Sequence, residues 1–333
     1  MYEEAQTIKD LLDNADHIVI IQPDNPDGDS LGSCLALEQI LGNLGKKVDM
    51  VCGVTLPPYL SYMPGWDRVQ QELPKKFDLA IIVDTSAVSL LENISKHSRG
   101  TNLRSKPLIV IDHHTTAESI DFSTVMLRVD SAAATAEVIY ELSKQLKLDI
   151  PREGKNALAG AILSDTLGLT TVSTTARTVY VIAELVEAGV SLSALENARR
   201  DFQRKSPELV HYKGQLLQRI EYYNDNRIAL LTIPWPEIEH YSPMYNPSVL
   251  ALDDMRLTTD TVVAVVLKIY PDGKVTGKIR SNFGKPVAAR LAEEFSGGGH
   301  EYASGFKLRN SPDLEALKTS IITKAVELLD ATV

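Results

Sequence analysis

The segment IIQPDNPDGDSLGS, residues 20–33, continues a short apolar run and brings together three aspartates, two prolines and two glycines. Closely spaced carboxylates repel one another and raise each other's pKa, so the arrangement is costly unless a cation or a catalytic task offsets it. A simple turn at a strand end, where Asp, Asn, Pro and Gly are common, would also explain this composition. Other parts of the sequence distinguish a metal or catalytic site from a simple turn.

The length and composition of the chain predict a two-domain globular protein. The chain has 333 residues, of which 44% are hydrophobic, enough to give each of two domains a buried core. We expect a cytoplasmic location, because no signal peptide and no membrane-spanning apolar run is recognisable. Cys34 and Cys52 form neither a disulfide framework nor a zinc pattern, and we interpret both as core residues. The formal charge of −10 argues against a nonspecific polyanion binder.

The first half of the chain has the pattern of an α/β domain. Four short, β-branched apolar runs predict buried parallel strands: 17–22, 48–53, 79–84 and 108–112. The clearest predicted helix spans 30–44 and is followed by Gly45 as a stop signal. Further helices are predicted at 133–146, 154–163 and 175–188. The fold class is therefore a mostly parallel sheet with flanking helices.

A change of pattern predicts a second, smaller α+β domain. Residues 191–221 are rich in charged side chains with helical spacing, which indicates a helical linker. Strand-like runs follow at 228–233, 261–270 and 274–280, with a Pro-Asp-Gly turn that indicates a hairpin. A helix at 286–295 then precedes a Gly-Gly-Gly-His segment. The predicted division is 1–190, 191–221 and 222–333.

Acidic and imidazole groups follow successive predicted strands. They are Asp24, Asp27 and Asp29, then Asp84, then Asp112-His113-His114, with Ser164-Asp165 in a later helix. In open α/β sheets the carboxyl ends of the strands border the ligand crevice, so these groups should converge. Each one alone would be interpreted as a helix cap, a turn or a surface polar residue. Their joint occurrence favours a site for manganese or magnesium, with two ions about 4 Å apart activating water against a phosphate.

The motifs resemble those of the DHH phosphoesterases. NPDGDSLGS (25–33), IVDT (82–85), VIDHH (110–114) and GAILSD (160–165) are similar to the four motifs of that family, in order. GKIRSN (277–282), GGGH (297–300) and ASGF (303–306) resemble its DHHA1 domain. The resemblance implies a catalytic DHH domain and a DHHA1 substrate-binding domain with a cleft between them. The length is most similar to that of short oligoribonucleases (nanoRNases), and RecJ nucleases share the core.

The resemblance also implies roles for individual residues. Two ions, Mn²⁺ or Mg²⁺, would be held by Asp27, Asp29, Asp84, His113 and Asp165. Asp84 would bridge them, Asp27 would hold the first, and the remaining ligands would complete the second. Asp84, His113 and His114 would be the catalytic residues. His114 would face the substrate phosphate and either help to neutralise it or supply a proton, while Asp112 would orient the histidine pair.

Substrate contacts are predicted mainly in the second domain. Glycines let backbone amides approach a phosphate, and Arg280 can grip one bidentately. The predicted set is Arg177, Arg280, Ser281, Asn282, Gly298, Gly299 and His300. A flexible loop would also explain the glycines, and a capped helix would explain Arg177.

The chain departs from the family pattern at Pro23. The family usually has a histidine there, and proline cannot ligate a metal through its side chain. We therefore expect a weak first metal site, unless Gln22, Asp24, Asn25 or water replaces the imidazole. A preference for Mg²⁺ over Mn²⁺ would be consistent with this loss.

These observations predict a metal-dependent phosphoesterase. The resemblance implies as substrates short oligoribonucleotides, cleaved to mononucleotides, and adenosine 3′,5′-bisphosphate, converted to AMP. The content of aromatic residues, 6%, argues against stacking along a long strand. The alternatives are a cyclic or linear dinucleotide phosphodiesterase, an exopolyphosphatase or pyrophosphatase, and a nucleotide-binding protein with a weakened metal site. Neither a membrane nor a long duplex is an expected partner, and a homodimer is left open.

Overall fold

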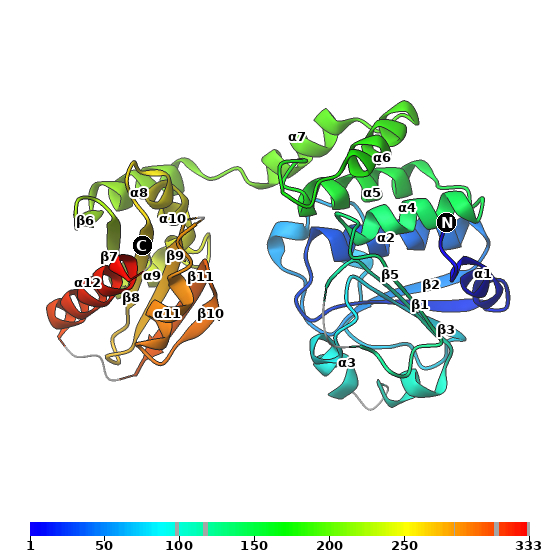
Figure 1. Cartoon of the computed structure of the whole chain (residues 1–333), viewed down its shortest axis with the longest axis horizontal. Coiled ribbons are helices and arrows are strands. Elements are labelled where there is room, and N and C mark those ends of the chain that lie inside the picture. The colour runs from blue at the N-terminus through cyan, green and yellow to red at the C-terminus, as the bar shows by residue number, and fades with distance from the viewer. Residues whose placement is uncertain (97–99, 116–118, 283, 310–312, 332–333) are drawn as a thin grey trace. The chain divides into compact units, whose positions relative to one another are not determined.

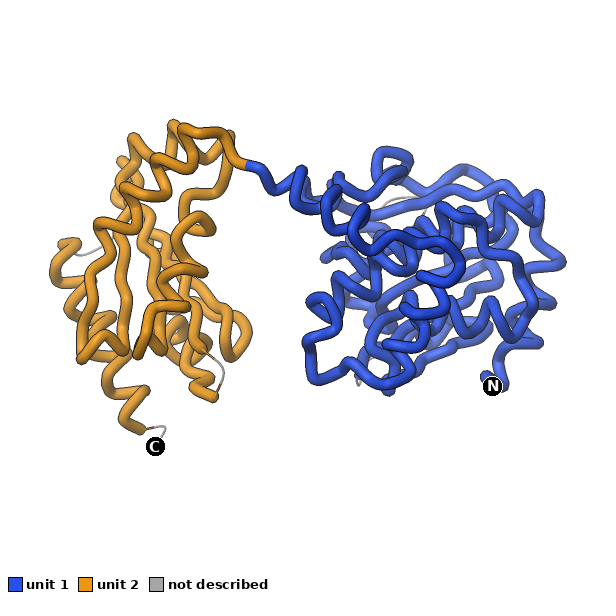
Figure 2. Tube along the Cα trace, turned by 90° about the horizontal axis from the view of Figure 1, so that it is seen from above, with its two compact units in different colours: residues 1–204 blue, residues 205–333 orange. Residues whose placement is uncertain are grey.

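The computed structural model describes residues 1–96, 100–115, 119–282, 284–309 and 313–331. The chain forms two compact units, residues 1–204 and 205–333 (Figure 2). The boundary falls inside the segment predicted as the linker. Helix α7 (Leu192–Phe202) belongs to the first unit, and α8 (Pro207–Gln218) belongs to the second. Leu209, Tyr212 and Leu216 of α8 are buried in the core of the second unit.

The first unit is built on a five-stranded parallel sheet of order β2-β1-β3-β4-β5 (Figure 1). Its strands are β1 (His17–Gln22), β2 (Lys47–Cys52), β3 (Leu79–Val83), β4 (Leu108–Asp112) and β5 (Val125–Arg128). Four of the five correspond to the predicted strands. β2 and β3 lie on opposite sides of β1, so the strand order reverses at the carboxyl ends of β1 and β3. Such a switch point is where open α/β sheets bind ligands.

Helices cover both faces of this sheet. They are α1 (Ala5–Asp13), α2 (Gly28–Asn43), α3 (Glu92–Lys96), α4 (Thr135–Gln145), α5 (Arg152–Asp165), α6 (Ala176–Glu187) and α7, with 3₁₀ turns at Pro58–Leu60, Trp66–Arg68, Val88–Leu91 and Gly100–Ser105. Ile18 and Ile20 face one core, while Val19 and Ile21 face the other. This alternation along β1 explains why the strand reads as a continuous apolar run.

The second unit contains a six-stranded mixed sheet of order β10-β11-β9-β8-β7-β6. Its elements are β6 (Glu221–Tyr223), β7 (Ile228–Ile233), α9 (Trp235–Tyr241), α10 (Pro247–Leu257), β8 (Val263–Ile269), β9 (Val275–Ser281), α11 (Ala288–Glu293), β10 (Gly298–His300), β11 (Ala303–Leu308) and α12 (Leu314–Asp330), in addition to α8. One core packs under α11 and α12, and the other under α8, α9 and α10. The two-domain α/β architecture predicted from the sequence is confirmed.

The glycine segment forms a strand and not the flexible loop that was the alternative explanation for its glycines. Gly298–His300 form strand β10, paired antiparallel with β11. A Cβ at Gly297 would lie 2.3 Å from the Gly305 carbonyl oxygen, and Gly299 has a φ of +141°. Close packing against β11 therefore accounts for these two glycines.

Among the described residues, no individual helix combines the length and apolar character that a membrane span needs. Two consecutive helices, α6 and α7, meet those criteria only as a pair, and they are bent by 98° relative to each other.

Candidate functional site

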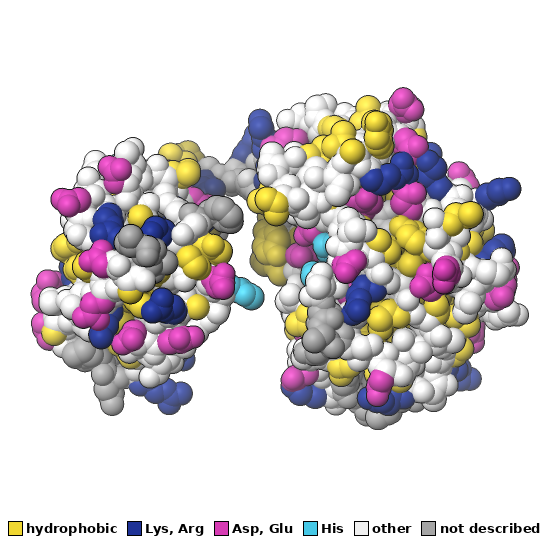
Figure 3. All heavy atoms as spheres, in the orientation of Figure 1, with side chains coloured by type: hydrophobic (Ala, Val, Ile, Leu, Met, Phe, Trp, Pro, Cys, Tyr) yellow, Lys and Arg dark blue, Asp and Glu magenta, His cyan; other side chains and the backbone are white. Residues whose placement is uncertain are grey.

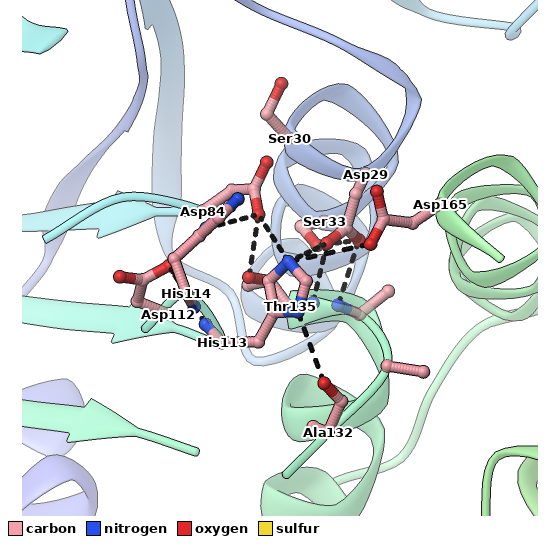
Figure 4. A network of polar contacts seen from close by, with 12 residues as sticks. Asp29, Ser30, Ser33, Asp84, Asp112, His113, His114, Ala132, Thr135 and Asp165 are labelled. Atoms are coloured by element: carbon pink, nitrogen blue, oxygen red, sulfur yellow. Dashed lines mark hydrogen bonds and ion pairs between the residues drawn. The ribbon is translucent and has the colours of Figure 1, made fainter. Parts of the chain in front are cut away.

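The predicted acidic residues meet at the switch point of the first sheet (Figure 4). Asp27 follows β1 and caps α2: its Oδ1 accepts N–H bonds from Asp29 and Ser30, both at 3.0 Å. The Ser30 hydroxyl accepts the N–H of Asp27 in return, at 2.9 Å. This reciprocal capping box fixes the start of α2 and places Asp29 in its first turn.

Two glycines bring α2 close to α5. A Cβ at Gly28 would lie 2.1 Å from the Ser164 hydroxyl oxygen, and one at Gly32 would lie 2.7 Å from the Cβ of Ala161. No side chain other than hydrogen fits at either position without a shift of the helices. Because Ser164 precedes Asp165, this contact carries Asp165 toward the start of α2.

Thr135 holds two buried carboxylates, those of Asp29 and Asp84. Its backbone N–H donates to Asp29 Oδ2 at 2.6 Å, and its hydroxyl donates to Asp84 Oδ1 at 2.9 Å. The N–H of Ala136 adds a bond to Asp29 Oδ1 at 3.1 Å. Asp29 is 1% exposed and Asp84 is 4% exposed. The N-terminus of α4 thus positions both carboxylates and partly compensates their charge.

Asp84 occupies an unusual backbone conformation. Its φ is +64°, in the left-handed region that few residues other than glycine adopt, although Asp and Asn tolerate it better than most. The turn ends β3 at Val83 and directs the Asp84 carboxylate into the cluster. Strained backbone of this kind occurs frequently at functional sites.

His113 lies at the centre of the cluster. Its Nε2 is 3.6 Å from Asp84 Oδ1, 3.6 Å from Asp165 Oδ2 and 3.8 Å from Asp29 Oδ2. Its Nδ1 lies 3.2 Å from the carbonyl of Ala132, which can only accept, so Nδ1 carries a proton. Nε2 is buried and has no hydrogen-bond partner in the described structure. A cation bound between Nε2 and the three carboxylate oxygens would satisfy this arrangement.

The acidic groups raise one another's pKa. Burial, followed by the negative charge of Asp29, raises the pKa of Asp165 to about 6, although His113 acts in the opposite direction. Burial, and then the charges of Asp29 and Asp27, raise the pKa of Asp84 well above its ordinary value. Burial is also the main cause of the raised pKa of Asp29. A bound cation would remove the repulsion that causes part of these shifts.

The donor set fits a divalent cation. Ligand atoms of Asp29, His113 and Asp165 lie within 4.8 Å of one another, and so do those of Asp84, His113 and His114. Carboxylate oxygens with one or two imidazoles suit manganese or magnesium. Asp27 is in neither group, and its Oδ1 caps α2. Its charge nevertheless acts on all three clustered aspartates.

Asp112 orients the histidine pair. Its Oδ1 accepts the backbone N–H of His113 at 2.9 Å and contacts His114 Nδ1 at 2.9 Å. Burial tends to raise the Asp112 pKa, but hydrogen bonds from His114 outweigh it and the pKa is lowered. The same bond raises the pKa of His114, whose side chain is 53% exposed. His114 is thus a fixed and accessible imidazole beside the cluster.

The residues considered as substitutes for the missing family histidine at Pro23 differ in burial. Pro23 and Gln22 are buried, and Asn25 is exposed. Asp24 Oδ2 accepts the backbone N–H of Asn93 at 2.9 Å. Asp24 belongs to neither of the two ligand groups.

The other predicted contacts differ in accessibility. Arg177 pairs with Glu141 and lies 3.7 Å from Glu184. In the second unit Ser281 is 1% exposed, and the Asn282 amide donates to the carbonyls of Arg256 and Thr261. These two side chains hold the fold around Arg280, which is half-buried, whereas His300 is exposed.

Sequence reasoning missed three residues of the site: Ser33, whose hydroxyl donates to Asp29 at 3.3 Å, Ala132 and Thr135. Ala132 acts through its carbonyl, for which a sequence carries no signal. Thr135 lies inside the helix predicted at 133–146 and is the first residue of α4, but its bond to a residue 106 positions earlier depends on the fold.

Thr135→Val should weaken metal binding, because the substitution keeps the backbone bond to Asp29 and removes only the hydroxyl bond to Asp84. Loss of such a supporting bond costs about 10–100-fold in metal affinity. Titration of the metal-depleted protein with Mn²⁺, followed calorimetrically, measures the change. Thr135→Ser keeps the hydroxyl and should bind like the unaltered chain. Equal affinity in Thr135→Val would exclude this positioning role.

A parallel sheet with carboxylates and imidazoles gathered at its switch point is typical of metal-dependent enzymes. Residues 17–165 match the DHH family, N-terminal domain, and residues 246–327 match the DHHA1 domain. The chain therefore belongs to the DHH family and carries a DHHA1 domain, which confirms the resemblance predicted from the sequence. The family is one of phosphoester hydrolases, in agreement with the predicted enzyme class.

This chain covers different shares of the lengths of its relatives. It is 29% identical to an A-adding tRNA nucleotidyltransferase of Aquifex aeolicus over 73% of this chain, but spans only 27% of that protein. It is 27% identical to a bifunctional oligoribonuclease and PAP phosphatase of Thermus thermophilus, over 86% of this chain and 82% of the relative. The crystal structure of an exopolyphosphatase-related protein from Bacteroides fragilis has a TM-score of 0.79 at 23% identity, covering 98% of this chain and 97% of that one. This last likeness concerns the fold.

Proposed function

We propose that this chain is a divalent-metal phosphoesterase that cleaves short oligoribonucleotides to mononucleotides and removes the 3′-phosphate of adenosine 3′,5′-bisphosphate. The observation that carries the proposal is His113 Nε2, buried without a hydrogen-bond partner among the described residues and facing three carboxylates. The match to an oligoribonuclease and PAP phosphatase over most of both chains supports this substrate class.

Asp29, Asp84, His113 and Asp165 would hold the second ion, and Asp27 would hold the first, weaker one. Mn²⁺ is the proposed ion, with Mg²⁺ as an alternative. When bound, divalent ions would polarise the phosphate and lower the pKa of water. Thr135 and the N-terminus of α4 keep Asp29 and Asp84 in place, and Asp27 caps α2 beside them.

His114 would serve the leaving group. Asp112 accepts the Nδ1 proton and keeps the ring oriented, which leaves Nε2 to donate to the substrate. In hydrolysis a bond forms between a water oxygen and phosphorus, the ester P–O bond breaks, and the leaving oxygen takes a proton. The proton would come from His114 Nε2. In the second unit, Arg280, Gly298, Gly299 and His300 would bind a terminal phosphate, with Ser281 and Asn282 supporting Arg280.

A substrate panel tests the proposal. The metal-depleted chain is supplied with Mn²⁺ or Mg²⁺ and given 5′-phosphorylated diadenylate, a longer oligoadenylate, adenosine 3′,5′-bisphosphate, cyclic di-AMP and pyrophosphate. We expect the diadenylate to give the highest kcat/KM and the bisphosphate to be converted to AMP. Preferential cleavage of cyclic di-AMP or pyrophosphate would show that the proposed substrate class is wrong. If no compound is turned over with either metal, the assignment as a phosphoesterase is wrong.

Metal affinity should rise with pH, because protons and the metal compete for the same carboxylates. The raised pKa values mean that the metal-free cluster keeps protons above the ordinary Asp range, up to about pH 6 for Asp165. The apparent affinity for Mn²⁺ should therefore increase between about pH 5 and pH 7 and then level off. Calorimetric titration in buffers of different ionisation enthalpy also counts the protons released. A pH-independent affinity would contradict the assignment of these carboxylates as ligands.

Pro23→His should restore a ligand at the first site. The substitution gives the loop after β1 an imidazole and a freer φ than proline allows. We expect the Mn²⁺ concentration for half-maximal activity to fall by about tenfold, equivalent to one added ligand worth about 1.4 kcal/mol. Pro26→His, in the same loop, serves as the control. If the unaltered chain already binds two equally tight ions, the first site has another ligand and the prediction is wrong.

A further inference from the structure

The second unit presents a row of cations on one face of its sheet. Along β9 the residues alternate: Val275, Gly277 and Ile279 are buried toward the core under α11 and α12, so Lys278 and Arg280 face the other side. Both are half-buried. Figure 1 shows β9 and β11 side by side in this unit.

The strand register shows what lies next to the two cations. Directly opposite partners on neighbouring antiparallel strands share a face. Arg280 is opposite Ala303, which is opposite His300; Lys278 is opposite Gly305, which is opposite Gly298. The residue of β11 that lies beside each cation therefore has either a methyl side chain or no side chain. The face beside Lys278 and Arg280 is low enough to admit a ligand against the backbone.

The charges on this face do not cancel. Four half-buried cations form a series in which each lowers the pKa of the next. Arg256 acts on Arg280, Arg280 acts on Lys278, and Lys278 acts on Lys268. Burial, and then the charge of Arg280, lower the pKa of Lys278, and no described acidic side chain forms an ion pair with it. Asp253, which is exposed, acts on Arg280. Half-buried cations that repel one another are costly unless an anion binds beside them.

We propose that Lys278 forms a second phosphate subsite beside that of Arg280, so that the second unit binds nucleotides carrying two phosphates separated by a nucleoside. Residues i and i+2 of a strand are about 6.6 Å apart, which suits phosphates on adjacent nucleotide positions and exceeds the spacing within a diphosphate. The guanidinium of Arg280 binds one phosphate through two parallel hydrogen bonds, and the ammonium group of Lys278 binds the other as a single compact charge. The nucleotide nature of the ligand rests on the proposed function.

The test measures binding without turnover. AMP, ADP, adenosine 3′,5′-bisphosphate and 5′-phosphorylated diadenylate are titrated into the full chain in EDTA, at fixed ionic strength. The unaltered chain should bind the bisphosphate about tenfold more tightly than AMP, from one additional charge-assisted contact, and ADP should show less of this gain. Lys278→Met should abolish the gain while changing AMP binding less than about twofold, and Lys278→Arg should retain it.

Lys274→Met is the matched control, because Lys274 precedes β9 in the same hairpin and lies 3.8 Å over the ring of Tyr270. Thermal transitions confirm that each variant is folded. Equal losses for AMP and the bisphosphate, or no loss in Lys278→Met, would overturn the second subsite. Since no metal is present, failure of the hydrolysis panel would leave this result standing, and failure here would leave the panel standing.

Discussion

Asp84→Asn is expected to abolish phosphoester hydrolysis without unfolding the chain. Asp84 is the buried carboxylate that lies 3.6 Å from His113 Nε2 and receives the Thr135 hydroxyl. Loss of a ligand that organises the metals should lower kcat by about a thousandfold or more, at about tenfold per 1.4 kcal/mol of transition-state stabilisation. Asparagine is chosen because it tolerates the φ of +64° at this position, where alanine would add strain.

The same substitution should not destabilise the metal-free protein. Burial and the neighbouring charges of Asp29 and Asp27 disfavour ionised Asp84, so a neutral side chain relieves repulsion. In EDTA the thermal transition should stay equal or rise. Asp78→Asn is the control, because Asp78 directly precedes β3 whereas Asp84 directly follows it. Asp78 accepts hydrogen bonds from the backbone N–H groups of Asp16 and His17. Retained activity in Asp84→Asn with an unchanged transition would remove Asp84 from the centre of the mechanism.

His114→Gln is expected to lower kcat by about 10²–10³-fold, the usual contribution of a positioned general acid. Glutamine keeps a hydrogen-bond donor but cannot transfer a proton. Metal affinity should change little, because His113 and the aspartates remain. KM should also stay close to that of the unaltered chain, because the effect falls on the chemical step.

The metal titration separates two roles for His114. Its Nδ1 lies 3.8 Å from Asp84 Oδ1, and the ring belongs to one of the two candidate ligand groups. If Mn²⁺ affinity falls together with kcat in His114→Gln, His114 is a ligand. A kcat that is unchanged would exclude both roles.

The fold was predictable where burial alone determines the pattern. β1, β3 and β4 are buried on both faces, so they appear in the sequence as continuous apolar runs. β5 has only one buried residue in its pattern, and it was missed. Helix α8 was assigned to a linker because its charged residues mask three buried positions, which pack only once the second unit has formed.

The candidate site was predictable only in part. Acidic and imidazole side chains at strand ends could be read directly, because parallel strands converge at one edge. The glycines at 28 and 32 could not be read as a helix contact, since their reason lies in Ser164 and Ala161. The cation row at Lys278 also stayed hidden, because strand register, which no local motif encodes, places it beside Gly305.

The most direct measurement is the position of the metal. Crystals of the chain soaked in Mn²⁺ and recorded at an energy near the manganese absorption edge would locate the ion by anomalous scattering. We expect a peak within bonding distance of His113 Nε2 and of carboxylate oxygens from Asp84, Asp29 or Asp165, and its loss in Asp84→Asn crystals. An active chain whose manganese peak lies away from His113, or that shows no peak at this cluster, would contradict the metal centre.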